Sequence, residues 1–244
     1  MGMFRIRRAS LQVYTFSAVC LVAWVVPGCA GTSSPWTIVC GTCEEPGRFV
    51  RLQAYDSQAF LVNQGGFSHP LNLSPQDWRS ILANVRVHAD LFFPMETTEQ
   101  PAFTPEEIDY LSITLNRAFA KASPEQWVVF GLSQPSPASV TEMTTGAWYA
   151  EGTTLHLLLA NYRAAVRLDN LRDVLDRDPL FEVLSAPRYE FAETDYAYAG
   201  SRKKSLLSSL RQETPHLAID YTQLLAEELD QNGYQDEEGK EQAQ

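Results

Sequence analysis

Hydrophobic and polar positions follow two periods along this chain, one typical of helices and the other of strands. The helical period of about 3.6 residues first appears after "LSPQDW". Ser74 is placed to cap a helix that begins at Pro75, and Asp77 lies in its first turn. The apolar positions that share one face of this helix are Trp78, Ile81, Leu82 and Val85. They predict a helix that packs on a core.

A second helix is predicted over residues 105–122. Thr104 is its expected N-cap, and Glu107, three residues later, completes a capping box. Ser123 and Pro124 end the pattern. The apolar stripe consists of Ile108, Leu111, Leu115, Ala118, Phe119 and Ala122. We expect this stripe to pack on the strand that follows, because the linker between the two elements is short.

The middle of the chain has the alternation and the apolar runs of strands. Three long strands are predicted, over Gln126–Ser133, Val140–Glu151 and Thr153–Ala164, with a tight turn at Glu151-Gly152. In the third, Leu155, Leu157 and Leu159 face one way, and His156, Leu158 and Ala160 face the other. Shorter strands are expected at 48–55, 58–62, 86–93, 188–193 and 216–221, and short helices within 167–179 and 205–212. We therefore expect an α+β fold, an antiparallel meander sheet covered by two or more helices in a single compact domain.

The first 28 residues have the order of a secretory signal. Arg5, Arg7 and Arg8 precede an apolar stretch from Leu11 to Val26, which is shorter than the roughly 20 residues of a membrane span. The stretch ends in Val26-Pro27-Gly28-Cys29, which resembles the lipobox of bacterial lipoprotein precursors. The resemblance implies that Cys29 is acylated and that residues 1–28 are removed. The alternative is an ordinary signal peptide or an uncleaved anchor, with Cys29 incidental.

The resemblance also implies an address. Two or three acyl chains make a stable anchor, whereas one chain binds only reversibly. Residue 30 is Ala and not Asp. In a diderm bacterium, the lipoprotein sorting pattern then implies the outer membrane, facing the periplasm. We expect four parts: the signal peptide (1–28), an acylated tether with a Cys-X-X-Cys pair (29–46), a globular domain (47–226) and an acidic disordered tail (227–244).

The charge of the chain limits its partners. Residues 1–28 carry three of the 19 basic residues and none of the 30 acidic ones, which leaves 16 basic against 30 acidic residues, a net charge of −14. Such a domain is repelled by nucleic acid and by anionic head groups. We therefore expect no nucleic-acid partner, contact with the membrane through the lipid anchor, and an envelope protein as a possible partner.

Cys40 and Cys43 form the pair "CGTC". In an exported chain, an even pair of cysteines is interpreted first as a disulfide. A redox motif normally opens a helix, but here Glu44, Glu45 and a Pro-Gly turn follow. Intermolecular and metal-binding uses remain open. We expect a structural disulfide.

No motif in the chain specifies a reaction, so we assign no catalytic residue, metal or cofactor. His88 and Asp90 would share one strand face, His69 precedes a proline, and His156 lies among leucines. Four acids alternate with arginines, a pattern that favours a solvated helix face over a calcium site: Asp169, Asp173, Asp176 and Asp178. Three tyrosines fit either an aromatic platform or an edge strand: Tyr189, Tyr196 and Tyr198. The first hypothesis is a non-enzymatic binding or assembly module anchored in the envelope. The alternative is an envelope hydrolase or metal-dependent enzyme that uses His69, His88 and nearby carboxylates.

Overall fold

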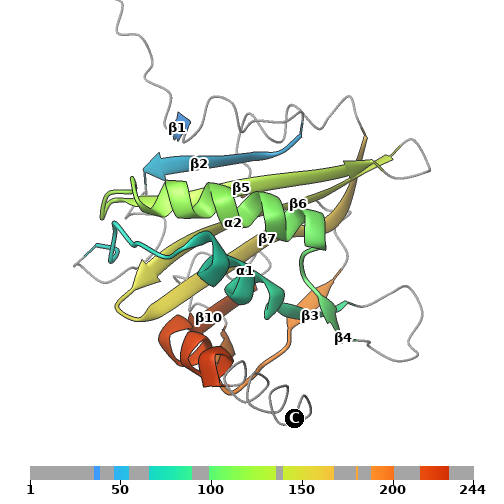
Figure 1. Cartoon of the computed structure of the whole chain (residues 1–244). Coiled ribbons are helices and arrows are strands. Elements are labelled where there is room, and N and C mark those ends of the chain that lie inside the picture. The colour runs from blue at the N-terminus through green and yellow to red at the C-terminus, as the bar shows by residue number, and fades with distance from the viewer. Residues whose placement is uncertain are drawn as a thin grey trace, which may run out of the picture. The chain divides into compact units, whose positions relative to one another are not determined.

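The structure, a computed structural model, describes residues 36–38, 47–54, 66–89, 99–135, 140–167, 180, 188–200 and 215–230. All of them belong to one compact unit, residues 34–244. They form an antiparallel seven-stranded sheet, a three-stranded sheet and helices (Figure 1). The predicted α+β class is confirmed.

The large sheet contains the predicted meander at its centre. Its strands, in spatial order, are β1 (Trp36–Ile38), β2 (Phe49–Ala54), β5 (Gln126–Pro135), β6 (Val140–Glu151), β7 (Thr154–Arg167), β10 (His216–Asp220) and β9 (Ala197–Gly200). Every neighbouring pair is antiparallel. Strands β5, β6 and β7 are consecutive in sequence and adjacent in the sheet. The long apolar runs of the sequence therefore become its central strands.

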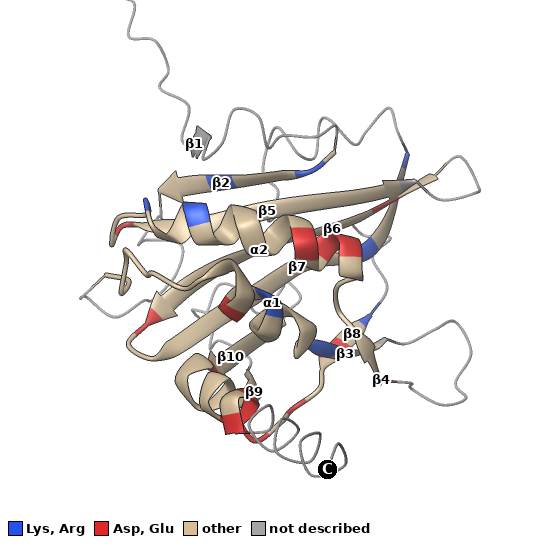
Figure 2. Cartoon of the chain, in the orientation of Figure 1, with Lys and Arg blue, Asp and Glu red and all other residues tan. Residues whose placement is uncertain are grey.

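Two helices begin at the capping residues that the sequence predicts. In α1 (Pro75–Ala83), the Ser74 hydroxyl accepts a hydrogen bond from the Asp77 amide, and the Asp77 carboxylate accepts one from the Ser74 amide. In α2 (Pro105–Phe119), Thr104 and Glu107 form the same reciprocal pair. Acidic residues occupy the first turn of α2 and a basic residue its last, which suits the helix dipole (Figure 2). This helix ends three residues before the predicted Ala122.

Both helices cover one face of the large sheet (Figure 1). The predicted stripes lie there, and most of their members are fully buried: Trp78, Ile81, Leu82, Val85, Leu111, Leu115, Ala118 and Phe119. Ala122 is also buried, whereas Ile108 is half-buried at the edge of the core. Phe119 lies 4.9 Å from Trp78 between ring centroids, and Trp78 lies 5.9 Å from Trp148 on β6. Leu155, Leu157 and Leu159 of β7 join this core, as predicted. The helix–sheet interface is therefore a continuous apolar layer.

The opposite face of the sheet carries a second apolar cluster. Its members are Phe49, Phe67, Trp127, Val129, Met143, Ala147, Tyr149, Leu158, Ala164 and Val166. Leu180 packs against it from elsewhere in the chain. Both faces of the central strands are therefore buried, and polar residues such as Thr145 and Asn161 lie within them, where the Thr145 hydroxyl accepts a hydrogen bond from the Asn161 side chain.

Several short elements are absent from the sequence prediction. A second sheet is formed by β4 (Glu99–Pro101), β3 (Arg86–Ala89) and β8 (Tyr189–Phe191), of which only β3 and β8 are predicted. The strand β1 uses residues assigned to the tether, and β9 is also unpredicted. Residues 221–230 are helical, so the helix enters the segment assigned to the tail. Of the helix expected within 167–179, Arg167 belongs to β7 instead. The rest of that segment, the predicted strand 58–62, the helix expected within 205–212 and residues 231–244 lie outside the described residues.

Candidate functional site

An irregular stretch of β7 prepares the candidate site. Leu159 pairs with Gly146 and Ala164 pairs with Met143, so β7 has two more residues than β6 between these points. Within this bulge, Arg163 adopts a φ of 49°, which is unusual for a residue other than glycine. The Thr144 hydroxyl accepts a hydrogen bond from the Arg163 amide at 3.3 Å. The bulge interrupts the alternation of the strand and directs the Arg163 side chain toward α2.

Arg163 forms a bidentate ion pair with Glu107. The two terminal nitrogens of the guanidinium donate to the two carboxylate oxygens at 3.0 and 2.8 Å. One of those oxygens also accepts from the Thr104 amide at 2.8 Å. The Glu107 side chain is only 1% exposed and that of Arg163 is 19% exposed. One carboxylate therefore caps α2 and fixes the helix to the bulge of β7.

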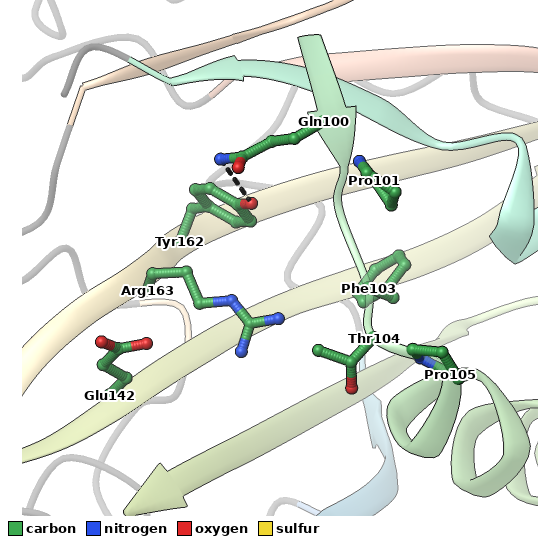
Figure 3. Close-up of a pocket in the computed structure, with 8 residues that line it drawn as sticks. All are labelled: Gln100, Pro101, Phe103, Thr104, Pro105, Glu142, Tyr162 and Arg163. Carbon is green, nitrogen blue, oxygen red and sulfur yellow. Dashed lines mark hydrogen bonds between the residues drawn. The ribbon is translucent and has the colours of Figure 1, made fainter. Parts of the chain in front are cut away.

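A cavity of about 380 Å³, open to solvent, lies beside Arg163 (Figure 3). Its lining residues are Gln100, Pro101, Phe103, Thr104, Pro105, Glu142, Tyr162 and Arg163. The Tyr162 hydroxyl accepts a hydrogen bond from the Gln100 side chain at 3.4 Å. Burial raises the pKa of Tyr162 above 10.0, so its hydroxyl stays protonated at neutral pH. The walls thus offer two aromatic rings, prolines, an amide and the carboxylate of Glu142.

Two polar groups of the lining are already engaged in hydrogen bonds within the fold. Arg163 is neutralised by Glu107, and the Thr104 hydroxyl accepts hydrogen bonds from the Glu107 amide and the Gln134 side chain. No histidine, cysteine or serine is among the eight lining residues. A nucleophile needs an adjacent base to activate it. The lining contains no such pair.

A row of aromatic rings crosses three strands of the large sheet elsewhere. The Tyr149 and His156 rings are parallel within 7°, with centroids 4.5 Å apart. His156 Nδ1 lies 2.9 Å from His216 Nε2, and the two rings are parallel within 6° with centroids 5.0 Å apart. Because the two nitrogens are close while the ring centroids are 5.0 Å apart, the parallel imidazoles lie edge to edge and not face to face. The Glu151 carboxylate lies 3.7 Å from the other ring nitrogen of His156.

His69 lies in the core. Its ring packs against Phe119, with centroids 5.0 Å apart, and its Nε2 accepts a hydrogen bond from the Ala150 amide at 3.1 Å. Burial lowers the pKa of His69 to about 4. The neighbouring Ser68 hydroxyl accepts from the Gly152 amide at 2.8 Å and so supports the β6–β7 turn. In this setting, His69 is a neutral structural histidine.

His88 belongs to a different sheet. It lies on β3, opposite Glu99 of β4 and Glu190 of β8, and is half-buried. Among the described residues, no contact joins His88 to His69. Asp90, proposed as a partner of His88, lies outside the described residues. The structure therefore does not bring together the two histidines of the enzyme hypothesis, whereas it does bring together His156 and His216.

The remaining sequence candidates divide into two groups. Cys29, Cys40, Cys43 and the acids between Asp169 and Asp178 lie outside the described residues. The three tyrosines point to different partners: Tyr189 donates to the Leu159 carbonyl, Tyr196 to the Asn84 side chain and Tyr198 to the Asp195 carbonyl. They do not form one platform, and Tyr198 lies on the edge strand β9.

The chain matches no family model, no curated protein and no solved structure. Within the described ranges, no helix has the length and apolar character needed to cross a membrane. The same residues contain no group of three or more His, Cys, Asp or Glu side chains arranged to hold a metal ion.

Proposed function

We propose that this chain is a lipoprotein anchored in the bacterial envelope and that its globular domain is a non-enzymatic binding module. The lipobox-like segment ending at Cys29 supports the anchor. The acidic balance of the domain supports a protein or envelope component as the partner, and not nucleic acid.

The cavity beside Arg163 carries the binding half of the proposal. The rings of Phe103 and Tyr162 wall it, and four of its five polar side chains are hydrogen-bonded within the fold. This is the usual composition of a recognition site. Arg163 and Thr104 are already hydrogen-bonded to Glu107, so we expect the cavity to recognise its ligand by shape and polarity.

The alternative, an envelope hydrolase or metal-dependent enzyme using His69 and His88, has less support. His69 is buried and has a pKa of about 4, which keeps it neutral and away from solvent. A general base works best with a pKa near the operating pH and within hydrogen-bond reach of its substrate. His69 meets neither condition.

Photocrosslinking in cells tests the binding module. A photoreactive amino acid is placed at Gln100 or Glu142 in the cavity, and at Leu229, which is 73% exposed, as the control. We expect one discrete crosslinked partner from the cavity positions and none from Leu229. The purified partner should bind the full chain in detergent, and Tyr162→Ala should weaken that binding. Equal crosslinking from all three positions, or unchanged binding by the variant, would exclude the cavity as the recognition site.

A further inference from the structure

The contact between His156 and His216 brings two imidazole nitrogens as close together as two neighbouring ligands of one metal ion. His156 Nδ1 and His216 Nε2 lie 2.9 Å apart, with the two rings parallel within 6°. We propose that this pair binds a single d-block metal ion of the Cu²⁺, Ni²⁺ or Zn²⁺ type. The site goes beyond the proposed binding function and uses none of the residues of the Arg163 cavity.

The distance between the two nitrogens is close to what a metal requires. Bonds of 2.0–2.1 Å from zinc to imidazole nitrogens, at a tetrahedral angle, separate the nitrogens by about 3.3 Å. The nitrogens need separate by only a few tenths of an ångström, and each ring must turn so that its lone pair points at the metal and not at the other ring. His216 is the first residue of β10, so the end of a strand and not its middle accommodates the shift.

The two rings are held in place before a metal arrives. His156 lies within β7, and its ring is parallel to Tyr149, which is 1% exposed on β6. His216 pairs with Leu158 in the β7–β10 ladder. Ligands on neighbouring strands of one sheet are positioned more rigidly than ligands on loops. Less conformational entropy is therefore lost on binding.

Glu151 occupies the place of an outer-shell carboxylate. Its oxygen lies 3.7 Å from Nε2 of His156, the ring nitrogen that faces away from His216. A carboxylate that accepts a hydrogen bond from this nitrogen favours the tautomer whose inner nitrogen keeps its lone pair for the metal, and Glu151 needs to approach by only a few tenths of an ångström to do so. On binding, the hydrogen between the two histidines leaves the nitrogen that carries it, and that ring takes up a proton on its other nitrogen, so both ligands are neutral imidazoles.

The ligand set limits the metal. Imidazole nitrogen suits Cu²⁺, Ni²⁺ and Zn²⁺, whereas Mg²⁺ and Ca²⁺ prefer oxygen. In the described part of the chain, no third His, Cys, Asp or Glu completes the group. Water would fill the remaining positions, and Cu²⁺ should bind most tightly of the divalent ions.

Calorimetric titration tests the site directly. The full chain is purified in detergent through a tag without histidine, its cysteines are alkylated, and Cu²⁺, Ni²⁺, Zn²⁺ and Mg²⁺ are each added to metal-free protein. We expect one Cu²⁺ per chain with two coordinated nitrogens in the electron paramagnetic resonance spectrum, and no response to Mg²⁺. His156→Gln and His216→Gln should each weaken Cu²⁺ binding at least tenfold.

Matched variants separate this site from general binding by histidines and acids. His88→Gln removes a histidine of the other sheet, and Glu142→Gln removes a carboxylate elsewhere on β6; both should bind Cu²⁺ like the wild type. Glu151→Gln should weaken binding several-fold without abolishing it. Thermal unfolding shows whether each variant is folded. Equal affinity in the wild type and the His156→Gln/His216→Gln double variant, or no binding by the folded wild type, would overturn the proposal.

Discussion

Glu107 accepts two hydrogen bonds from Arg163, although the two residues are 56 positions apart in the sequence. The carboxylate is buried, so removal of the guanidinium would leave an unpaired charge away from water. We expect Arg163→Ala to lower the free energy of unfolding by about 3–5 kcal/mol. Urea denaturation of the full chain in detergent measures this loss.

Arg79 provides the control for that prediction. It forms an ion pair with Asp109 at 3.1 Å, but the two side chains are 42% and 68% exposed. An exposed pair contributes little, so Arg79→Ala should lower the free energy of unfolding by less than about 1 kcal/mol. Equal losses in the two variants would show that the pair of Glu107 and Arg163 does not hold α2 to the sheet.

Phe119 tests the docking of α2 on the sheet. It is fully buried and contacts the rings of Trp78 and His69. Phe119→Ala removes most of that contact and should lower the free energy of unfolding by about 3–5 kcal/mol. Glu106→Ala, at the exposed first turn of the same helix, should lower it by less than about 1 kcal/mol. Two similar, small losses in denaturant melts would contradict the packing described for α2.

The elements that the sequence predicts well are those determined by local interactions. Both helices begin at their predicted caps because the capping groups lie three residues apart. The strand β6 has the predicted bounds because the sequence QPSPAS, typical of a loop, precedes it and a turn at Gly152 follows it. The strands β1, β4 and β9 have only three or four residues, and pairing with their neighbours, more than any pattern of their own, makes them strands.

The candidate sites depend on contacts between distant residues, which a local pattern does not record. Glu107 is fully explained by its role as a cap, so its burial against Arg163 has no separate signal. The one clue is the charge of Arg163 within an apolar strand. His156 and His216 are 60 residues apart, and they meet only because β10 pairs with β7 in one register. Neither contact follows from hydrophobic periodicity.

Cys29 remains a prediction of the sequence, and acyl labelling of cells tests it. Cys29→Ser should abolish incorporation of labelled fatty acid and leave the precursor uncleaved, because the sulfur is the expected site of acylation. Cys20→Ser is the matched control: Val19 precedes this cysteine, in place of a small residue, so labelling should be unchanged. Labelling that persists in Cys29→Ser would refute the anchor.

The burial of His69 should make stability depend on pH. Its pKa is about 4 in the folded chain, against an ordinary value of 6.5, because burial disfavours the charged ring. Between these two values the unfolded chain binds a proton at His69 that the folded chain does not, so lowering the pH favours unfolding. We expect this residue to remove up to about 3 kcal/mol of stability between pH 6.5 and pH 4, with no further loss below that range. Denaturant melts across this range, compared with those of His69→Gln, isolate the contribution. A difference between the two proteins that stays constant with pH would mean that His69 is accessible to protons in the folded state.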